Sequence, residues 1–577
     1  MSKQSDNKNL EAMRHSAAHV LAQAVLEMFP EAKLSIGPTI ENGFYYDFEL
    51  PRTLIPEDLP LIEKKMQKII KADQKFEKHP EPRKKAIEFY KKLKQPYKVE
   101  LIEELSAKGG SRYAGKEVTF YKNDNFVDLC KGPHLKSTGE IGPFKLTSIA
   151  GAYFKGDPGR PMLQRIYGVA FATQKELDDY LKQIEEAKKN DHRKIGKKLD
   201  LFSFHEEGPG FPFWHPKGTI LWKIIEDYWH EVHKREGYLE SRTPVLLREN
   251  LWHQSGHYDH YRDFMYFTKI DKQKYALKPM NCPGGLLIYK SRNHSYREFP
   301  LKIAELGLVH RHELAGVLHG LFRVRSFTQD DAHVYCLEEQ IEDEVIKVIK
   351  LTLEIYKKFG FKDYRVELST RPKKSIGTDA MWDKAEKSLA NALKKENIKY
   401  DLNPGDGAFY GPKIDFHILD SMGRSWQMGT IQLDFSMPDR FELEYDAKDG
   451  KKKRPIMIHR AIFGSFERFV GILLEHYKGN LPLWLAPVQA MIIPIADKHL
   501  PYAKKVLEEL KSKNVRVEID QNSITMQKKI KNAEELRIPL MLIVGDKEMK
   551  EKKVAVRSKE KGDEGMQDIN NIIEKIN

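Results

Sequence analysis

The sequence has few cysteines and no long apolar run. Its 577 residues include three cysteines, Cys130, Cys282 and Cys336, an odd number that argues against a disulfide framework and for a reducing compartment. No window approaches the roughly 20 apolar residues that a membrane-spanning helix needs. The first residues, MSKQSDNKNLEAMRHSAAHV, lack the apolar core of a signal peptide. We therefore expect a cytoplasmic protein that has no membrane partner.

Internal repeats, low-complexity tracts and the two commonest nucleotide-binding motifs are also absent from the sequence. It contains no G-x-x-x-x-G-K-[ST] loop, and no convincing G-x-G-x-x-G stands between an expected strand and helix. Any use of ATP therefore cannot depend on a P-loop or a Rossmann turn. Positive charge is in excess, with a net charge of +13. That balance fits either a polyanionic partner or a merely lysine-rich proteome.

Composition and periodicity divide the chain into three domains joined by one helix. Residues 1–172 combine a helix over 10–28 with strands and turns rich in Gly and aromatics, which is typical of an α+β domain. Residues 199–480 have no regular βαβ rhythm, and their polar-aromatic strands favour an antiparallel sheet. After a Pro-rich boundary, residues 481–577 alternate strands and helices and predict a small α/β domain with a mixed, mostly parallel sheet.

Residues 173–198 are predicted to form the linker helix. Thr173 and Glu176 have the T-x-x-E spacing of a capping box, and leucines and an isoleucine then recur at helical spacing. The basic run KKNDHRKIGKK (188–198) at its end is either a solvated helix face or a contact for an RNA backbone.

The most informative stretch is AELGLVHRHELAGVLHGLFRVRSFTQDDAHVYC (304–336), whose pattern predicts strand, loop and strand. Arg311 and Glu313 lie near the end of the first strand. Alternate side chains share one face of a strand. In the second strand these are Arg323, Arg325, Phe327, Gln329 and Asp331. Such a row fits the wall of a polar cleft with an aromatic side, and the planar fork of arginine suits phosphates.

A second element is HRAIFGSFERFVGILLEHY (459–477), in which Gly464 and Ser465 open an apolar helix and Arg468 follows one turn later. Together the two stretches resemble motifs 2 and 3 of the class II aminoacyl-tRNA synthetases. Pro244 in YLESRTPVLL matches the proline of motif 1, which usually forms the dimer interface. KPMNCPGG, HGLFRVRSFTQDDAH, GAFYGPKIDF, SWQMGTIQLDF and HRAIFGSFERF resemble, in order and spacing, the threonyl-tRNA synthetase family. This similarity covers nearly the whole chain.

The resemblance implies both a fold and an activity. The fold is a class II antiparallel sheet flanked by helices, with an N-terminal α+β editing domain and a C-terminal α/β anticodon-binding domain. The activity is formation of threonyl-adenylate from L-threonine and ATP, transfer to the 3′ end of tRNA(Thr), and hydrolysis of mischarged seryl-tRNA(Thr). A homodimer through the catalytic domain is implied. The N-terminal ubiquitin-like domain common in bacterial members is expected to be missing.

For ATP, the resemblance implies that Arg311 holds the α-phosphate and that Arg323 and Arg468 hold the γ-phosphate. Mg²⁺ would bridge the phosphates. Phe327 would stack on adenine, and Glu313 would contact its amino group. The remaining member of the implied ATP site is Gln432. Positioning and charge stabilisation, rather than acid–base chemistry, dominate such a reaction.

Cys282, His333 and His459 match the family's zinc ligands, with one Zn²⁺ per subunit, although one cysteine and two of 21 histidines would be a weak signal alone. Three protein ligands and an open position are typical of a substrate-binding zinc. Contact with the threonine hydroxyl would reject valine, which an apolar pocket separates poorly. The other residues implied for the threonine site are Met280, Gln329, Asp331, Tyr410 and Gln427. Two departures from the family's strings, Gly285 in CPGG and Met428 in WQMGT, leave the ligands intact.

Serine has the same hydroxyl and lacks one methyl, a difference worth roughly 1–3 kcal/mol, so a second, hydrolytic site is expected. His15 and His19 share one helix face, and Cys130 and His134 repeat their spacing. This pattern resembles the editing domain of threonyl and alanyl synthetases. It predicts either a closed His₃Cys zinc site or, as we favour, a metal-free pocket that positions water and the mischarged ester. The expected neighbours are Asp128, Tyr45 and Asp47.

In the last domain, GDKE (545–548) and VAVR match strings of the family's anticodon-binding domain, which implies that Glu548 and Arg557 contact unpaired bases. QNSITMQKK (521–529) departs from the family's pattern. Two other functions stay open: a weakened paralogue that binds tRNA or mRNA as a regulator, and an editing hydrolase with a degenerate synthetase body. The complete set of arginines and zinc ligands favours the ligase.

Overall fold

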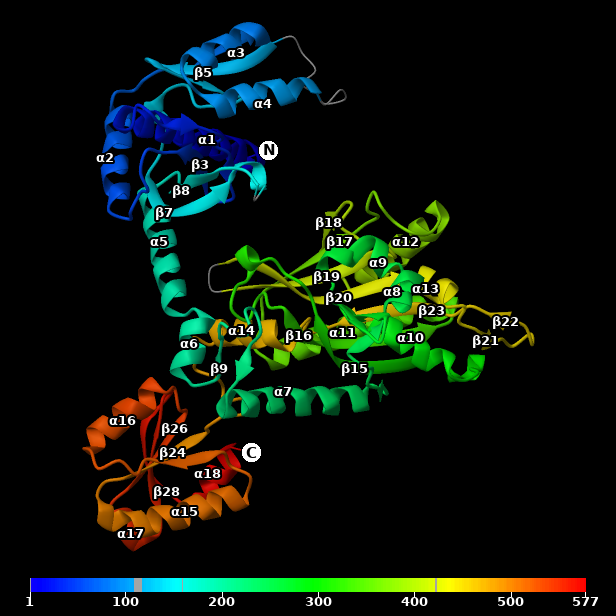
Figure 1. Ribbon diagram of the computed structural model, residues 1–577. Helices are drawn as coiled ribbons and strands as arrows, with labels where there is room; N and C mark the ends of the chain where they lie inside the picture. Colours follow the sequence, from blue (N-terminus) through cyan, green and yellow to red (C-terminus); the bar gives the residue numbers. More distant parts are fainter. Residues whose placement is uncertain (1, 108–116, 158, 421–422, 577) are drawn as a thin grey trace. The chain divides into compact units, whose positions relative to one another are not determined.

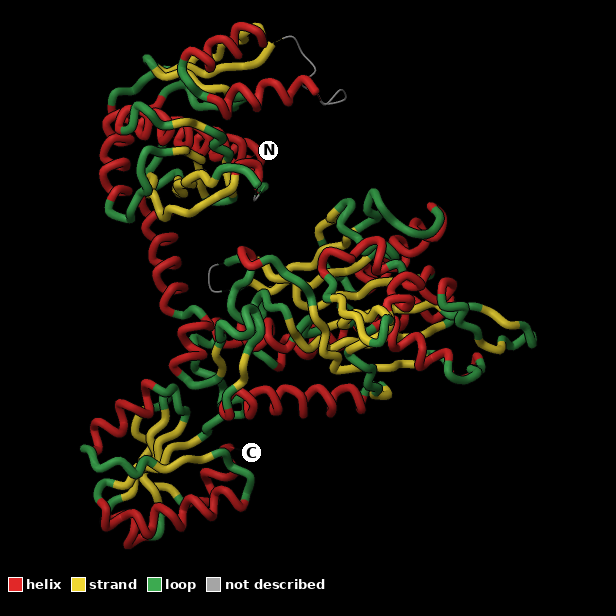
Figure 2. The backbone as a smooth tube through the Cα atoms, in the orientation of Figure 1, coloured by secondary structure: helices red, strands yellow, loops and turns green. Residues whose placement is uncertain are grey.

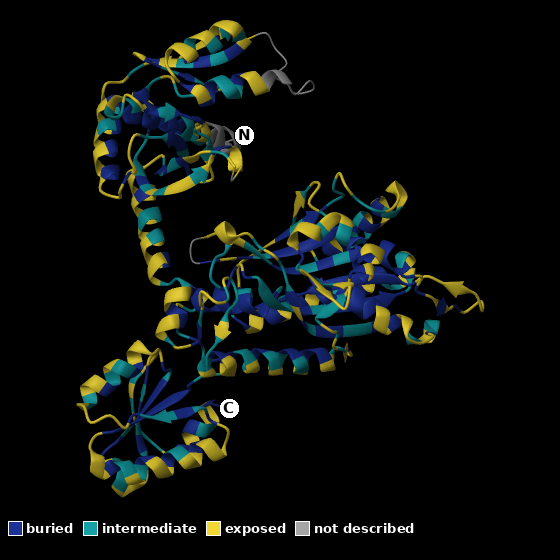
Figure 3. Ribbon diagram, in the orientation of Figure 1, coloured by how far each residue is buried: buried dark blue, intermediate teal, exposed yellow. Residues whose placement is uncertain are grey.

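The computed structural model describes residues 2–107, 117–157, 159–420 and 423–576. The chain forms two compact units, Met1–Glu185 and Glu186–Asn577 (Figure 1). Each unit has buried apolar clusters of its own (Figure 3), and none of the clusters in the described part of the chain includes residues of both units. No helix formed by the described residues is long and apolar enough to cross a membrane.

The first unit is an α+β domain built on two antiparallel sheets. The larger has the order β1-β3-β8-β7 with β2 beside β3, and the smaller has the order β4-β5-β6. The buried faces of α1 and α2 form one core with the larger sheet. Its elements are α1 (Ser2–Met28), β1 (Lys33–Leu34), β2 (Thr39–Ile40), β3 (Gly43–Glu49), α2 (Asp58–Lys71), β4 (Glu77–Pro82), α3 (Arg83–Lys92), α4 (Pro96–Ala107), β5 (Glu117–Asn123), β6 (Phe126–Leu129), β7 (Phe144–Tyr153) and β8 (Met162–Ala170).

The linker is two helices, not the single helix predicted over 173–198. The capping box at its start is confirmed, because the Thr173 and Glu176 side chains each accept from the other's backbone N–H, at 3.3 and 3.0 Å. The first helix is α5 (Gln174–Lys189), and a second helix, α6 (His192–Lys198), begins after Asp191, whose carboxylate caps it. The basic run also buries His192, Ile195 and Gly196, so it is not simply a solvated face.

The second unit contains an eight-stranded sheet in the order β11-β15-β16-β23-β20-β19-β17-β18. Its central pairs, from β15 to β17, are antiparallel, as predicted. The strands of this sheet are β11 (Leu239–Glu240), β15 (Leu301–His310), β16 (Ser326–Cys336), β17 (Tyr364–Ser369), β18 (Asp401–Asn403), β19 (Lys413–Leu419), β20 (Ser425–Asp434) and β23 (Ile456–Ala461).

Helices α7, α11 and α14 cover one face of this sheet, and polar side chains of β16 lie on the other face. Along β16, Ala332 and Val334 point into the large core made with α7, α11 and α14, so the alternate residues Asp331 and His333 lie on the opposite face. The helices around this sheet and the smaller strands are β9 (Phe202–Ser203), β10 (Phe213–Trp214), α7 (Pro216–Arg235), β12 (Leu246–Arg248), α8 (Glu249–Ser255), α9 (His257–Tyr261), β13 (Phe267–Ile270), β14 (Gln273–Leu277), α10 (Cys282–Lys290), α11 (Ile341–Lys358), α12 (Asp379–Lys395), α13 (Ser436–Arg440), β21 (Tyr445–Asp446), β22 (Lys452–Lys453) and α14 (Phe466–His476).

The C-terminal part is an α/β domain with helices on a five-stranded sheet of order β25-β24-β26-β27-β28 (Figure 2). Two strand pairs are parallel and two are antiparallel, so the expectation of a mostly parallel sheet is wrong. The added edge strand is β28, which the sequence pattern missed. Its elements are β24 (Ala490–Pro494), α15 (Leu500–Ser512), β25 (Val517–Ile519), α16 (Met526–Glu535), β26 (Leu540–Val544), α17 (Asp546–Glu551), β27 (Val554–Ser558), β28 (Gly562–Gln567) and α18 (Ile569–Ile576).

Candidate active site

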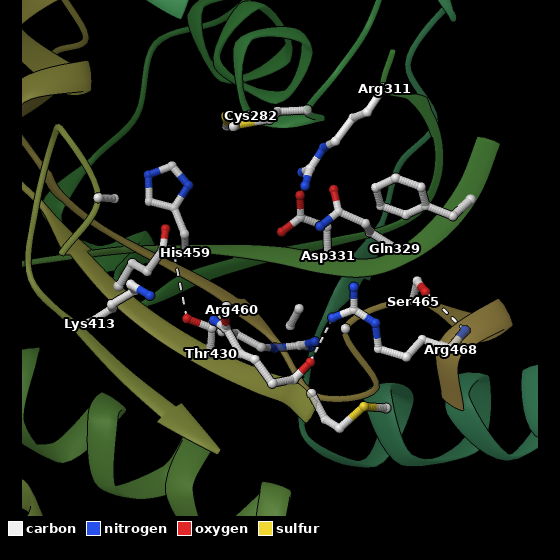
Figure 4. A pocket seen from close by; sticks show the side chains of 18 of the residues that line it. Cys282, Arg311, Gln329, Asp331, Lys413, Thr430, His459, Arg460, Ser465 and Arg468 are labelled. Carbon is white, nitrogen blue, oxygen red and sulfur yellow. Dashed lines mark hydrogen bonds between the residues drawn. The ribbon is translucent and has the colours of Figure 1, made fainter. Parts of the chain in front are cut away.

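The polar face of the eight-stranded sheet carries a cavity of about 390 Å³. Polar and aromatic side chains from β16, β20, β23 and α14 line it together with Arg311, and Figure 4 shows Arg311 and Arg468 pointing into the same space from different elements. The predicted residues that line it are Met280, Cys282, Arg311, Glu313, Arg323, Phe327, Gln329, Asp331, Tyr410, Gln427, Gln432, His459 and Arg468.

Two of the predicted arginines meet partners that keep their guanidinium groups in the cavity. Arg311 follows β15, donates from Nε to the Pro279 carbonyl at 3.2 Å, and places its guanidinium carbon 4.9 Å from the centre of the Phe327 ring. Arg323 donates from Nε to a Glu313 carboxylate oxygen at 3.0 Å. A flat aromatic face beside two cations suits a ligand that joins an aromatic base to phosphates.

Arg468 is held by the start of α14. Its backbone N–H donates to Ser465 Oγ at 3.1 Å, so the predicted serine is the N-cap. Its guanidinium donates to the carbonyls of Phe322 and Gln427 at 3.0 and 2.9 Å. Burial, with the charges of the other two arginines, lowers the pKa of Arg468 to about 10. Three like charges around one cavity attract a polyanion.

Arg325 was predicted to share the face of Phe327 and Gln329, and this is wrong. It donates instead to the carbonyls of Glu313 and Pro209, at 2.9 and 3.1 Å, and is not among the residues that line the cavity. The reason is that β16 begins only at Ser326. The alternation of a strand therefore does not extend to Arg325.

Cys282, His333 and His459 come together as the sequence predicted. All three are buried, and one ligand atom from each lies within 4.8 Å of the others. Cys282 opens α10, while His333 and His459 are directly paired across β16 and β23. Sequence spacing could not foresee this pairing, because the strands are far apart in the chain.

The chemistry of these three side chains fits a zinc ion. His333 Nε2 is buried with no hydrogen-bond partner among the described residues, a cost that a metal bond would remove. His459 Nε2 lies 2.9 Å from Asp434 Oδ2, which leaves Nδ1 as its free nitrogen. A carboxylate behind a histidine orients metal-binding histidines in general.

The residues that the resemblance implies for binding threonine lie near the Cys–His–His group. Burial raises the pKa of Asp331 to about 6, and one of its oxygens accepts from Asn281 Nδ2 at 3.3 Å. Tyr410 donates to Gln432, so the implied threonine and ATP residues are in direct contact. His257 Nε2, which sequence reasoning missed, lies 3.0 Å from Met280 Sδ.

A buried carboxylate missed by the sequence pattern organises the far wall of the cavity. Asp415 accepts from Gln427 Nε2 at 2.5 Å, Thr430 Oγ1 at 3.0 Å and Lys413 Nζ at 2.8 Å. Because Gln427 uses one amide N–H here, its side-chain carbonyl oxygen and its second N–H are the groups left for a ligand. Lys413 lies within the string GAFYGPKIDF, which was the available signal.

A second cavity, of about 590 Å³, lies in the first unit beside α1. Here Cys130 Sγ lies 3.0 Å from His15 Nε2 and 3.1 Å from His134 Nε2. His19 does not join them, since its Nε2 lies 2.8 Å from Asn123 Oδ1. The metal-like group of described residues here is therefore His15, Cys130 and His134, without the fourth ligand of a closed His₃Cys site.

Burial keeps the groups of this second site neutral. It lowers the pKa of His19 to about 4 and that of His134 to about 2. It also raises the pKa of the Cys130 thiol to about 11. A neutral thiol beside neutral imidazoles is suited to hydrogen bonding rather than to nucleophilic attack.

Asp128 lines this cavity, as expected, but with different neighbours. It pairs with Lys98 Nζ at 2.5 Å and accepts from Tyr46 OH at 2.6 Å. Neither Lys98 nor Tyr46 was predicted. The proposed neighbours Tyr45 and Asp47 point to the other side of β3, where both contact Arg165, because successive strand residues alternate.

The two residues predicted to contact anticodon bases have partners within the C-terminal domain. Glu548 accepts from the Gly545 backbone at 2.9 Å at the start of α17. Arg557 lies on β27 and pairs with Glu534 at 3.3 Å. The departing stretch 521–529 contains the start of α16, capped by Thr525.

Three domain families match the chain. Residues 266–477 match the tRNA synthetase class II core domain (G, H, P, S and T), and residues 489–577 match the anticodon binding domain. Residues 118–167 match the threonyl and alanyl tRNA synthetase second additional domain. With the antiparallel sheet and the arginine-lined cavity, these matches make the protein a class II tRNA synthetase.

Whole-chain comparisons define the family. The threonine–tRNA ligase of Clostridium tetani is 55% identical over 99% of this chain and 88% of its own length. That of Caldanaerobacter subterraneus subsp. tengcongensis is 57% identical over 97% of this chain and 86% of its own length. A crystal structure of the RNA binding domain of threonyl-tRNA synthetase from Cryptosporidium parvum has a TM-score of 0.65 at 42% identity, covering 67% of this chain and 97% of that one. The chain belongs to the threonine–tRNA ligase family.

Proposed function

We propose that this protein activates L-threonine with ATP, transfers it to the 3′ end of tRNA(Thr), and hydrolyses seryl-tRNA(Thr). The observation that supports this most strongly is a single cavity lined by three arginines, the Phe327 ring and two members, Cys282 and His459, of a buried Cys–His–His group. The domains that we assign are editing over 1–172, catalysis over 199–480 and anticodon binding over 481–577, joined by the linker 173–198.

In the activation step, Arg311 holds the α-phosphate while Arg323 and Arg468 hold the γ-phosphate of ATP, which binds with Mg²⁺. Phe327 stacks on adenine, and Glu313 and Gln432 complete the nucleotide site. The threonine carboxylate attacks the α-phosphorus, the bond to the bridging oxygen breaks, and pyrophosphate leaves. The fixed cations stabilise charge that develops on the phosphates, so no proton transfer is needed.

Cys282, His333 and His459 hold zinc beside this nucleotide site. When bound, zinc supplies a Lewis acid for the amino group and hydroxyl of threonine, and valine has no such hydroxyl. The Asp331 carboxyl and Gln329 amide bind the amino group from the same strand. Met280, Tyr410 and Gln427 close the amino-acid pocket.

Serine passes the first site, so we assign its removal to the cavity of the first unit. His15, His19 and Cys130 line it and His134 bonds to Cys130, while Asp128 lines it in a cluster with Lys98 and Tyr46. The neutral histidines and thiol position water and the mischarged ester, in a pocket that needs no metal.

This editing assignment predicts that His15→Ala leaves activation intact but stops hydrolysis of seryl-tRNA, because His15 lines the cavity. The measurement is deacylation of purified seryl-tRNA(Thr), with threonine-dependent pyrophosphate exchange as the control. Accurate charging by a His15→Ala, His19→Ala double variant would refute the assignment.

Dimerisation and tRNA reading complete the proposal. The segment around Pro244 forms the interface of a homodimer through the catalytic domain, and Leu239 beside it is 59% exposed in the single chain. In the C-terminal domain, Glu548 and Arg557 contact anticodon bases. Aminoacylation of tRNA(Thr) tests the function as a whole: we expect charging with threonine and none with valine. Absence of threonine charging would overturn the proposal.

A further inference from the structure

One buried histidine outside these sites joins three separate elements of the second unit. His192, the first residue of α6, is 0% exposed. Its Nδ1 lies 2.8 Å from Glu475 Oε1 near the end of α14, and its Nε2 lies 3.0 Å from the backbone nitrogen of Leu321. Figure 1 shows α6 beside α14. None of the functions assigned above uses this residue.

The hydrogen bonds define the protonation of the imidazole. The backbone N–H of Leu321 can only donate, so Nε2 carries no proton and accepts it. The proton of the neutral ring is then on Nδ1 and is donated to Glu475, which also accepts the His192 backbone N–H at 3.2 Å. A positive ring with a proton on Nε2 would lose the bond to Leu321.

A metal site is not the better explanation of this cluster. Asp191, His192 and Glu475 do lie close enough to one another to hold an ion. Both ring nitrogens of His192 are, however, already hydrogen-bonded, and Asp191 accepts from the Arg193 backbone at 2.8 Å as the cap of α6. The arrangement therefore favours a structural role in which His192 holds neighbouring elements in place.

Leu321 connects the histidine to the phosphate site. It lies in the turn 319–323, which carries Arg323 into the cavity. The adjacent Phe322 ring is centred 4.1 Å from the His192 ring, and the Phe322 carbonyl accepts from Arg468 Nε at 3.0 Å. One histidine thus holds the short segment on which both γ-phosphate arginines depend.

The turn 319–323 lies in close contact with the imidazole of His192. Gly320 has φ +50°, and a Cβ at that position would lie 2.2 Å from His192 Nε2. Only a residue without a side chain allows this contact without displacement. The turn is therefore fitted to the ring, and its backbone position follows that of His192.

We propose that His192 is a positioning residue for ATP: together with Glu475 it fixes the turn 319–323, so that Arg323 and Arg468 bind the phosphates. It contacts no substrate itself. The inference rests on the proposed function, because it gives His192 and Glu475 a positioning role in the same phosphate site. It also gives the linker helix α6 a direct part in nucleotide binding.

Two substitutions separate the bonds of His192. In His192→Asn the amide N–H₂ can still donate to Glu475 but leaves the Leu321 N–H without its acceptor. In His192→Gln the longer side chain can bring its carbonyl oxygen near the position of Nε2. We expect His192→Asn to raise the KM for ATP about tenfold in threonine-dependent pyrophosphate exchange, with the KM for threonine within about twofold, and His192→Gln to recover most of the loss.

A matched control is His294→Asn. His294 is also buried, pairs with Glu298 at 3.3 Å and with the Tyr289 carbonyl at 3.0 Å, but does not line the cavity. The His294→Asn variant should have a lower melting temperature but no selective increase in the KM for ATP. If His192→Asn changes both KM values equally, or neither, while the wild type is active, the positioning role is wrong and the proposed function stands. A wild type without threonine-dependent exchange would overturn both.

Discussion

Glu467 is a carboxyl whose surroundings make the stability of the fold depend on pH. It lies in the first turn of α14 and is buried, and its two oxygens lie 3.0 and 3.2 Å from the Thr328 backbone nitrogen. Burial raises its pKa from 4.5 to about 8. The folded protein therefore prefers the protonated form of this group.

The raised pKa of Glu467 determines how stability changes with pH. Stability contributed by Glu467 is complete below pH 4.5 and is lost as the pH rises through about 8. Glu467→Gln cannot ionise, so its melting temperature should rise relative to the wild type between about pH 4.5 and pH 8. Exposed Glu444→Gln should follow the wild type throughout. A difference for Glu467→Gln that stays constant across this range would show that the carboxyl does not titrate there.

At the residue scale, the sequence predicted most of the residues that line the proposed catalytic cavity but fewer of those in the proposed editing pocket. Phe327, Gln329 and Asp331 share one face because they lie within β16, where alternation holds. Lys98 and Tyr46 escaped notice, since nothing in their local sequence marks a lysine or tyrosine that will meet Asp128 from another element. Such contacts depend on tertiary packing, not on spacing.

The helix α14 couples local stability to the arrangement of the proposed phosphate site. Its N-cap Ser465 accepts the backbone N–H of Arg468, so one turn both starts the helix and aims the guanidinium. Ser465→Ala should therefore lower stability by about 1 kcal/mol and also raise the KM for ATP. Thermal melts and pyrophosphate exchange measure the two effects.

Thr525→Ala provides the matched control for this cap. Thr525 caps α16 in the C-terminal domain, where its Oγ1 accepts from the Lys528 backbone at 3.4 Å. It should lower the melting temperature but leave the KM for ATP unchanged. An unaltered KM in Ser465→Ala would mean that the cap does not position Arg468.

At the element scale, periodicity predicted which segments become helices and strands better than where they break or pair. The strands within 304–336 were foreseen, but the break at Asn190 was not, because the basic run continues the helical pattern across it. That His333 and His459 share one site was implied by resemblance alone, and their pairing across two strands was not predicted. Register between distant strands is set by the whole core, which no local pattern contains.

At the scale of the molecule, the two compact units separate the two proposed chemistries. The buried clusters of the described chain fall on one side or the other of Glu185. A protein consisting of residues 186–577 should therefore fold and retain threonine-dependent exchange while losing hydrolysis of seryl-tRNA. The fragment's melting profile is the control for folding. A folded fragment without exchange would show that the first unit contributes to activation.

The central claim is that one cavity combines phosphate-binding arginines with a zinc site that selects the hydroxyl. Its most direct test is pyrophosphate exchange with threonine and with valine, in the full chain before zinc removal by a chelator, after it, and after zinc is restored. The account predicts exchange with threonine but not valine, loss of that exchange in the metal-free protein, and recovery with zinc in the wild type but not in Cys282→Ser. Undiminished threonine exchange in protein shown by metal analysis to be zinc-free would contradict it.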